Sequence, residues 1–303
     1  MYTIVRVDRR IAEAIEPLGT KNKFWFTSPD GARTLFKAEE RGTGEDWAEK
    51  IACELCVLLG LPHVHYELAL EVEGQTPGVI CASCVSSNQP LAHGNQLLVA
   101  ADPNYPQDLR RFKVAAYSVQ AVAGVLRNLR PPSDQWLNGA PPHMSALDFF
   151  TGYLMLDAWV ANQDRHHENW AAIRAGEAMS LAPTFDHGAS LARNLGDKER
   201  HERLTSRDQN YQVGAFARRA RSALYADAAE PRPLTTVAAW RAFADLTPIA
   251  AEVWLKRLEA LEPTAIHEIV EQIPPQRLSA VGREFTIYLL EENRRRLLEG
   301  NRE

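Results

Sequence analysis

The sequence predicts an α+β fold of two lobes, a small antiparallel β-rich N-terminal lobe at residues 1–85 and a larger, mainly α-helical C-terminal lobe at residues 86–303. Segments that alternate between apolar and polar residues, rich in β-branched and aromatic side chains, recur in the N-terminal part and are typical of strands. Beyond residue 110 most apolar segments repeat with helical periodicity. A chain of 303 residues is also long enough for two domains or two lobes of one domain.

Each lobe can be divided into expected elements. We expect strands at residues 2–7, 24–26, 33–38, 64–72 and 78–85, and a helix from Glu45 to Leu59. In the second lobe we expect helices at residues 110–129, 144–161, 215–226, 237–246, 249–258, 264–272 and 275–298. Two short strands flank residues 174–180, and the charged segment at residues 190–204 is expected to be mobile.

Composition and charge are those of an ordinary globular protein, with 45% hydrophobic and 24% charged residues. The net charge of -5 gives no general attraction to nucleic acid or to an anionic membrane. The N-terminus lacks the apolar core of a signal peptide, and no apolar run reaches the length of about eighteen residues that a membrane span needs. We therefore expect a cytoplasmic protein with no direct nucleic-acid partner and no membrane partner.

Three polar residues between Val160 and Gly188 predict a metal site. Asp164, Asn169 and Asp186 flank the two short strands, so a hairpin would bring them to one edge. Their oxygen atoms suit Mg2+, which is held by few carboxylates and shares its coordination shell with phosphates. In protein kinases a catalytic aspartate likewise stands five residues before a metal-binding asparagine, and a second metal-binding aspartate follows later in the chain.

The two motifs here, N-Q-D-R-H-H-E-N and L-A-P-T-F-D, resemble those of the HipA-like kinases. In these bacterial serine/threonine kinases the catalytic loop reads roughly N-x-D-x-H-x-x-N and the metal motif L-x-P-x-(F/Y)-D. The Asp-Arg-His sequence is also similar to that of type II phosphatidylinositol 4-kinases. The chain departs from the eukaryotic kinase signature, because F-D-H-G replaces D-F-G and no A-P-E follows.

The resemblance implies a bilobal protein-kinase-like fold with ATP and Mg2+ as cofactors. Asp164 would orient the acceptor hydroxyl, His166 would stiffen the catalytic loop, and Arg165 would meet the substrate or a phosphate. Asn169 and Asp186 would hold the metal.

The N-terminal lobe offers residues for the nucleotide. The turn G-T-K-N-K, which carries Gly19, Thr20, Lys21 and Lys23, resembles the short phosphate-covering turn of the HipA-like families. Lys37 is expected to grip the α- and β-phosphates while paired with Glu49; Glu45 and Glu54 are the alternatives on the same helix. Backbone groups from Ala82 to Val85 would bind adenine at the hinge.

The acceptor is left open. A protein serine or threonine hydroxyl leads, with self-phosphorylation near Thr20 as one form of it. A lipid or small-molecule alcohol is the alternative, and a non-catalytic ATP-binding regulator is another. Full-length HipA-like toxins of toxin–antitoxin systems carry an extra N-terminal subdomain. The resemblance therefore implies either a function that differs from the toxin's or a small regulatory or antitoxin-like protein that supplies the missing part.

Two C-x-x-C pairs favour a different class, a zinc-binding module. Cys53 with Cys56 and Cys81 with Cys84 could together form a tetrahedral zinc site. Neither pair lies in a turn, however, since the first falls in the helix of residues 45–59 and the second in an extended stretch. Buried thiols that pack as small hydrophobic groups are the simpler expectation.

Overall fold

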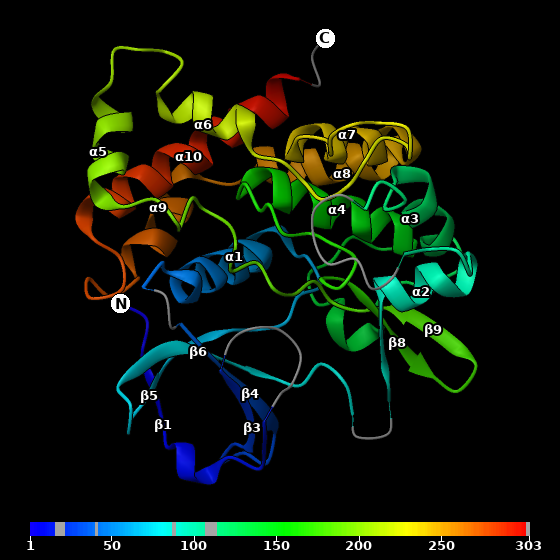
Figure 1. Ribbon diagram of the computed structural model, residues 1–303, viewed down its shortest axis with the longest axis horizontal. Helices are drawn as coiled ribbons and strands as arrows, with labels where there is room; N and C mark the ends of the chain where they lie inside the picture. Colours follow the sequence, from blue (N-terminus) through cyan, green and yellow to red (C-terminus); the bar gives the residue numbers. More distant parts are fainter. Residues whose placement is uncertain (16–21, 40–41, 87–88, 107–113, 301–303) are drawn as a thin grey trace.

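The computed structural model describes residues 1–15, 22–39, 42–86, 89–106 and 114–300. Figure 1 shows a sheet that forms one end of the molecule and a larger body of helices at the other. The predicted α+β fold, with an antiparallel-rich sheet beside many helices, is confirmed. The exact lobe boundary between residues 85 and 86 stays a prediction.

The N-terminal sheet has six strands in the order β1-β5-β6-β4-β3-β2. These are β1 (Val5–Val7), β2 (Ala14–Ile15), β3 (Lys23–Thr27), β4 (Arg33–Ala38), β5 (Glu67–Glu71) and β6 (Thr76–Ala82). All neighbouring pairs are antiparallel except β1 and β5, which run parallel. The first strand is shorter than the expected 2–7, and η1 (Arg9–Ile11), a 3-10 turn, follows it.

The alternation of side chains along β4 decides which residue faces the helical body. Phe36 packs with Phe24 and Phe26 in a small cluster on one face of the sheet. Lys37, the next residue, therefore points to the other face, because successive side chains of a strand point to opposite sides. Its partner in the ladder is Val79, which belongs to the main hydrophobic core. The strand thus presents a single lysine toward the interior of the molecule.

Helix α1 (Glu45–Leu59) lies between this sheet and the helical body (Figure 1) and has the bounds that the sequence predicts. It ends at Gly60, whose φ of 66° is left-handed and whose N–H bonds the carbonyls of Cys56 and Val57. Both ends of α1 are tied to the helical body. At the start, Arg277 pairs with Asp46 at 2.6 Å; at the end, Arg257 bonds the carbonyl of Leu59 at 2.8 Å.

The β1–β5 edge of the sheet is tied to the same body. Arg277 also donates to the carbonyl of Ala69 on β5, at 2.7 Å. The N–H of Tyr2, just before β1, donates to the carbonyl of Gln272 at 2.7 Å. These bonds join one edge of the N-terminal sheet to the segment around α9 and α10.

The helical body contains a second, three-stranded sheet and nine α-helices among the described residues. The strands are β7 (Leu91–His93), β8 (Ala171–Ala175) and β9 (Ala178–Leu181), in the order β7-β8-β9. The helices are α2 (Gly94–Ala101), α3 (Val119–Leu126), α4 (Ala146–Trp159), α5 (Asp197–Thr205), α6 (Val213–Arg219), α7 (Thr236–Leu246), α8 (Pro248–Glu259), α9 (Pro263–Glu271) and α10 (Ala280–Glu299). A 3-10 turn, η2, spans Asp134–Trp136. The hairpin of β8 and β9 is the one that the sequence predicts.

Helix α4 runs through the centre of the helical body, and all but one of its fourteen residues are buried. Ser145 and Asp148 form a capping box that fixes where it begins. The helix then delivers the chain at Val160 into the segment that carries Asp164. A site on this segment consequently rests on an almost fully buried helix.

Several expected elements differ from the structure. The helix expected at residues 215–226 is α6, which ends at Arg219, and the strand expected at residues 78–85 is β6, which ends at Ala82. Helix α3 starts only at Val119, where the side chain of Ser118 accepts from the N–H of Ala121; residues 107–113 lie outside the described part. Helix α10 starts at Ala280 for the same kind of reason, with Ser279 as its cap. The charged segment after Gly188 is not irregular throughout, because it contains α5. Among the described helices, none combines the length and the apolar character of a membrane span.

Substitution of Trp254 tests the contact between α8 and α4. Its ring is fully buried, and its Nε1 donates to the carbonyl of Asp148 at 2.9 Å. Trp254→Ala should lower the free energy of unfolding by about 3–5 kcal/mol, measured by urea denaturation. Ile249→Ala on the same helix is the matched control: that side chain is 82% exposed, so its change should stay within about 0.5 kcal/mol. Equal effects of the two substitutions would contradict the packing described.

Candidate active site

The structure brings Lys37 together with two carboxylates from distant parts of the chain. Its Nζ lies 3.5 Å from Oε1 of Glu49 on α1 and is bonded to Oδ1 of Asp186. The side chains of Lys37 and Glu49 are 9% and 1% exposed, whereas that of Asp186 is 32% exposed. The cluster therefore has a closed end at Glu49 and an end at Asp186 that solvent can reach. The other glutamates of α1 are used elsewhere, Glu45 with Arg193 and Glu54 with Lys50.

The charge of Lys37 is fixed by these neighbours. Burial alone would lower the pKa of the ammonium group, but the carboxylates of Asp186 and Glu49 outweigh burial and raise the pKa above its usual value. Lys37 is consequently a cation held between Glu49 and the more exposed Asp186. A buried cation of this kind must keep an anionic partner, which can be a carboxylate or a phosphate.

Hydrogen bonds within the catalytic loop orient Asn169. Its Nδ2 donates to the carbonyl of Asp164 at 2.7 Å. Because the amide nitrogen is held in this way, Oδ1 is the atom that a cation could use. The N–H of Asp164 donates to Oδ1 of Asn162 at 3.2 Å, and the N–H of His166 donates to the carbonyl of Asp164 at 2.8 Å. The loop thus fixes the side chain of Asn169 and the backbone of Asp164.

His166 lies inside this loop and is buried. Its Nδ1 accepts from the N–H of Glu168 at 3.1 Å, and its Nε2 lies 3.8 Å from Oδ1 of Asp164. These contacts are with the loop itself, which fits the expected stiffening role.

Arg165 lies in the protein interior and supports the loop from there. The expectation that it contacts the substrate or a phosphate is therefore wrong. Its side chain is 1% exposed and forms two hydrogen bonds to Asp157 of α4, at 2.7 and 2.9 Å. It also donates to the carbonyls of Asn169 at 2.5 Å and Phe185 at 3.3 Å. One guanidinium therefore holds both motifs, the loop that ends at Asn169 and the segment that precedes Asp186.

Asp186 is aimed by the segment around it. Thr184 forms a short parallel bridge with the chain after α1, through hydrogen bonds of 2.9 Å to Pro62 and Val64. Asp186 itself has a left-handed φ of 60°, and its N–H donates to the hydroxyl of Tyr66 at 3.4 Å. The F-D-H-G variant therefore still directs the aspartate toward Lys37.

His187 fills the position after Asp186 and belongs to the scaffold. Its Nε2 is 2.9 Å from Oγ1 of Thr184, and burial holds the pKa of the imidazole well below its usual value. It is therefore neutral at pH 7. The following Gly188 lies against α1, since a Cβ there would be 3.3 Å from the carbonyl of Glu45 and 3.6 Å from Oε2 of Glu49.

The other predicted nucleotide-binding residues are placed only in part. Gly19, Thr20 and Lys21 lie outside the described residues. Lys23 starts β3 directly opposite Lys37, so the two lysines share one face of the sheet.

The expected hinge has its own hydrogen bonds. Ala82 ends β6 opposite Thr34. Both backbone groups of Val85 contact Oγ of Ser83, the N–H at 3.3 Å and the carbonyl at 2.8 Å. A contact between these backbone groups and adenine stays a prediction, and at Val85 it would have to compete with Ser83.

The four cysteines do not form the zinc site that their spacing allows. Within the described ranges, the one group of three or more converging His, Cys, Asp or Glu ligands contains Cys53 but none of the other three cysteines. Cys53 and Cys56 are buried in α1, and burial raises the pKa of all four thiols.

Two surface hollows lie away from these residues. One, of about 570 Å³, lies between α9 and α10, and the other, of about 540 Å³, is lined by α7, α8 and Leu298. Each is lined by more carboxylates than basic side chains. Because carboxylates repel phosphate, neither hollow suits a nucleotide.

Sequence reasoning found only part of the scaffold of the site. Thr184 and Tyr66 were not expected to orient it. Asp157 could orient the loop on the sequence alone, because it is the one carboxylate in the apolar stretch F-F-T-G-Y-L-M-L-D-A-W-V, but a surface or capping group was the more usual interpretation. A charge at such a position needs a buried partner, and Arg165 provides it.

Comparison with known proteins places the fold. No protein-family model and no curated protein sequence matches the chain. Among solved structures, the Helicobacter pylori proinflammatory kinase CtkA is similar, with a TM-score of 0.70 at 18% identity over 97% of this chain and 96% of that one. HipA of a Shewanella oneidensis toxin–antitoxin system, solved with HipB and operator DNA, gives a TM-score of 0.57 at 11% identity. This alignment covers 95% of the present chain and 66% of HipA.

Substitution of Asp157 tests the support beneath the loop. Asp157→Asn keeps the shape of the side chain but leaves the guanidinium of Arg165 buried without a counter-charge, so the free energy of unfolding should fall by about 3–5 kcal/mol in a urea titration. Glu252→Gln removes one partner of the exposed pair with Lys256 on α8 and should cost less than about 1 kcal/mol. A cost for Asp157→Asn no larger than that of the control would show that the buried pair does not support the loop.

Proposed function

We propose that this chain, which has the protein-kinase-like fold of the HipA-like kinases, transfers the γ-phosphoryl group of ATP to a hydroxyl group. The observation that carries the proposal is the support of both motifs by one buried guanidinium. Arg165 holds the carbonyls of Asn169 and Phe185, so the catalytic loop and the segment of Asp186 are fixed together. Asp186 in turn contacts Lys37, which Glu49 holds from behind.

The residues present fit a magnesium nucleotide. Asp186 is the most exposed member of the charged cluster, and the amide of Asn169 is turned so that its oxygen can act as a ligand. Lys37 is a fixed cation that a phosphate could share with Asp186. Bound Mg2+ would neutralise negative charge that develops on the phosphate oxygens.

The roles of the other residues follow from their placement. Lys37 would position the α- and β-phosphates while Glu49 holds it in place. Asp164, with a side chain that is 21% exposed, would accept a hydrogen bond from the acceptor hydroxyl and finally take its proton. The acceptor oxygen bonds to the γ-phosphorus as the bond to the bridging oxygen breaks. Because the transition state of this reaction is loose, positioning matters more than a strong base.

The acceptor class and the partner are part of the proposal. A protein serine or threonine hydroxyl is favoured by the similarity of both motifs to the HipA-like serine/threonine kinases, and self-phosphorylation near Thr20 is one form of it. HipA was solved together with HipB, and the present chain spans about two thirds of the HipA chain. We therefore include a small binding protein, as HipB is for HipA, among the proposed partners of this chain.

The proposal is tested with purified full chain, γ-labelled ATP and Mg2+. Label should appear on the protein or on an added protein acceptor, and mass spectrometry should place it on serine or threonine. Asp164→Asn should reduce the labelling rate by at least about 100-fold, since it removes the group that orients and accepts the proton. Asp134→Asn, at an exposed position in η2, is the matched control and should label at the wild-type rate.

Binding is read separately as the thermal shift that ATP and Mg2+ produce together. The wild type and Asp164→Asn should both be stabilised, whereas Asp186→Asn should lose the Mg2+-dependent part of the shift. Stabilisation without labelling of any offered acceptor would indicate a non-catalytic nucleotide-binding protein. A wild-type protein that neither binds nor labels would overturn the kinase proposal.

A further inference from the structure

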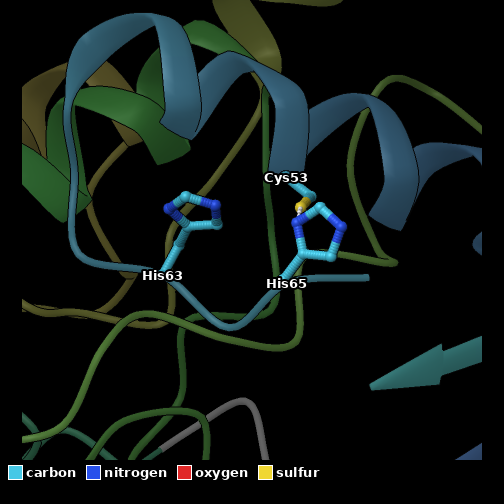
Figure 2. A group of neighbouring side chains, drawn as sticks. All are labelled: Cys53, His63 and His65. Carbon is cyan, nitrogen blue, oxygen red and sulfur yellow. Dashed lines mark hydrogen bonds between the residues drawn. The ribbon is translucent and has the colours of Figure 1, made fainter. Parts of the chain in front are cut away.

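Cys53, His63 and His65 form a cluster that the proposed kinase chemistry does not use. Figure 2 shows Cys53 projecting from α1 toward the rings of both histidines, which rise from the segment after this helix. The potential ligand atoms of the three residues all lie within 4.8 Å of one another. Cys53 is buried, His63 is half-buried and His65 is exposed, so the cluster reaches from the core to the surface.

One pair within the cluster already has the separation of two ligands in a tetrahedral metal site. Sγ of Cys53 and Nδ1 of His65 are 3.6 Å apart. Two ligands at about 2.3 Å (sulfur) and about 2.0–2.1 Å (nitrogen) from a zinc ion, separated by a tetrahedral angle, would lie about 3.5 Å apart. The protein therefore already holds this pair at nearly the separation that zinc requires.

Each histidine also has the outer partner that metal-binding histidines need. Nδ1 of His63 contacts the carbonyl of Leu61 at 2.7 Å, which leaves Nε2 for a metal. In Figure 2 one ring nitrogen of His63 is turned toward Cys53 and His65. Nε2 of His65 contacts Oε1 of Glu67 at 2.6 Å, which leaves Nδ1 for a metal. A carbonyl or carboxylate on the far nitrogen fixes the tautomer and the ring orientation of a ligating histidine.

The ligand types of the cluster favour a transition metal. The N–H of Tyr66 donates to the sulfur of Cys53 at 3.3 Å and so fixes its position. The carboxylates of Glu54 and Glu67 both contact Lys50 nearby, so the ammonium group beside the site is neutralised by negative charge. Sulfur and imidazole ligands select zinc and related transition metals over Mg2+, which prefers oxygen.

We propose that Cys53, His63 and His65 bind one Zn2+ ion, with the fourth coordination position open on the solvent side beside His65. This site is separate from the magnesium site proposed at Asn169 and Asp186. It joins α1 to the segment of residues 61–66, which forms the parallel bridge with Thr184 two residues before Asp186. The ion would thus stabilise the segment that positions the metal-binding aspartate.

The test uses the full chain stripped of metal by a chelator and titrated with Co2+ under a thiol-free reductant. Cobalt replaces zinc in tetrahedral sites and reports a cysteine ligand through a thiolate-to-cobalt absorption band in the near ultraviolet. The wild type should bind one equivalent of Co2+ and show this band. Added Zn2+ should displace the Co2+ and abolish the band. Excess Mg2+ should leave the band unchanged, because Mg2+ does not favour sulfur ligands.

Matched variants separate ligands from bystanders. Cys53→Ser should abolish the thiolate band, whereas Cys56→Ser, at the other buried cysteine of α1, should keep it. His65→Gln should weaken binding at least tenfold, and Glu67→Gln should weaken it about 10–100-fold through the outer partner. His201→Gln, at an exposed histidine of α5, should bind as the wild type does.

Two outcomes would overturn the proposal. One is a wild-type protein, folded by circular dichroism, that binds no cobalt or binds it without the thiolate band. The other is an affinity of His65→Gln for Co2+ equal to that of His201→Gln, which would mean that other residues bind the metal. His65 is exposed, so its substitution should not unfold the chain, and metal binding is read independently of nucleotide binding or phosphoryl transfer.

Discussion

The buried ion pair of Arg165 and Asp157 is the constraint on which the rest of the site depends. Removing both charges from water has a large desolvation cost, which only close and well-satisfied contacts offset. Arg165 meets that condition because it also donates hydrogen bonds to Oγ1 of Thr184 and to the carbonyls of Asn169 and Phe185. The need to satisfy one guanidinium therefore brings α4, the catalytic loop and the segment before Asp186 to a common position.

The features that depend on local sequence could be predicted. Helix α1 has its predicted bounds because an apolar-periodic segment ends at a glycine. The hairpin of β8 and β9 was predictable from two apolar stretches around a polar turn, and the contact of Lys37 with Glu49 from the motif order. Each of these rests on periodicity, turn chemistry or spacing, which can be read along the chain.

Contacts between separate segments could not be predicted in the same way. The C-x-x-C spacing indicates two cysteine pairs that could bind one metal ion. Cys53 and Cys56 lie on a helix, however, where residues three apart need not bind the same ion, and Cys81 is on a strand. The histidines that do approach Cys53 follow ten and twelve residues later and show no motif. The sequence suggested that Arg165 faces the substrate because its neighbours in the motif are expected to do so. Only the buried ion pair with Asp157 shows that it does not.

The anchoring of one sheet edge has a mechanical consequence. Bonds from Arg277 to Ala69 and from Tyr2 to Gln272 fasten the β1–β5 edge to the helical body. Strand β3 lies three strand spacings from β5, or about 14 Å. If the sheet rotates about its fastened edge, displacement grows with distance from the pivot, so β3 travels farther than β6. The sheet is thus a lever whose long arm carries β3 and, at its start, Lys23.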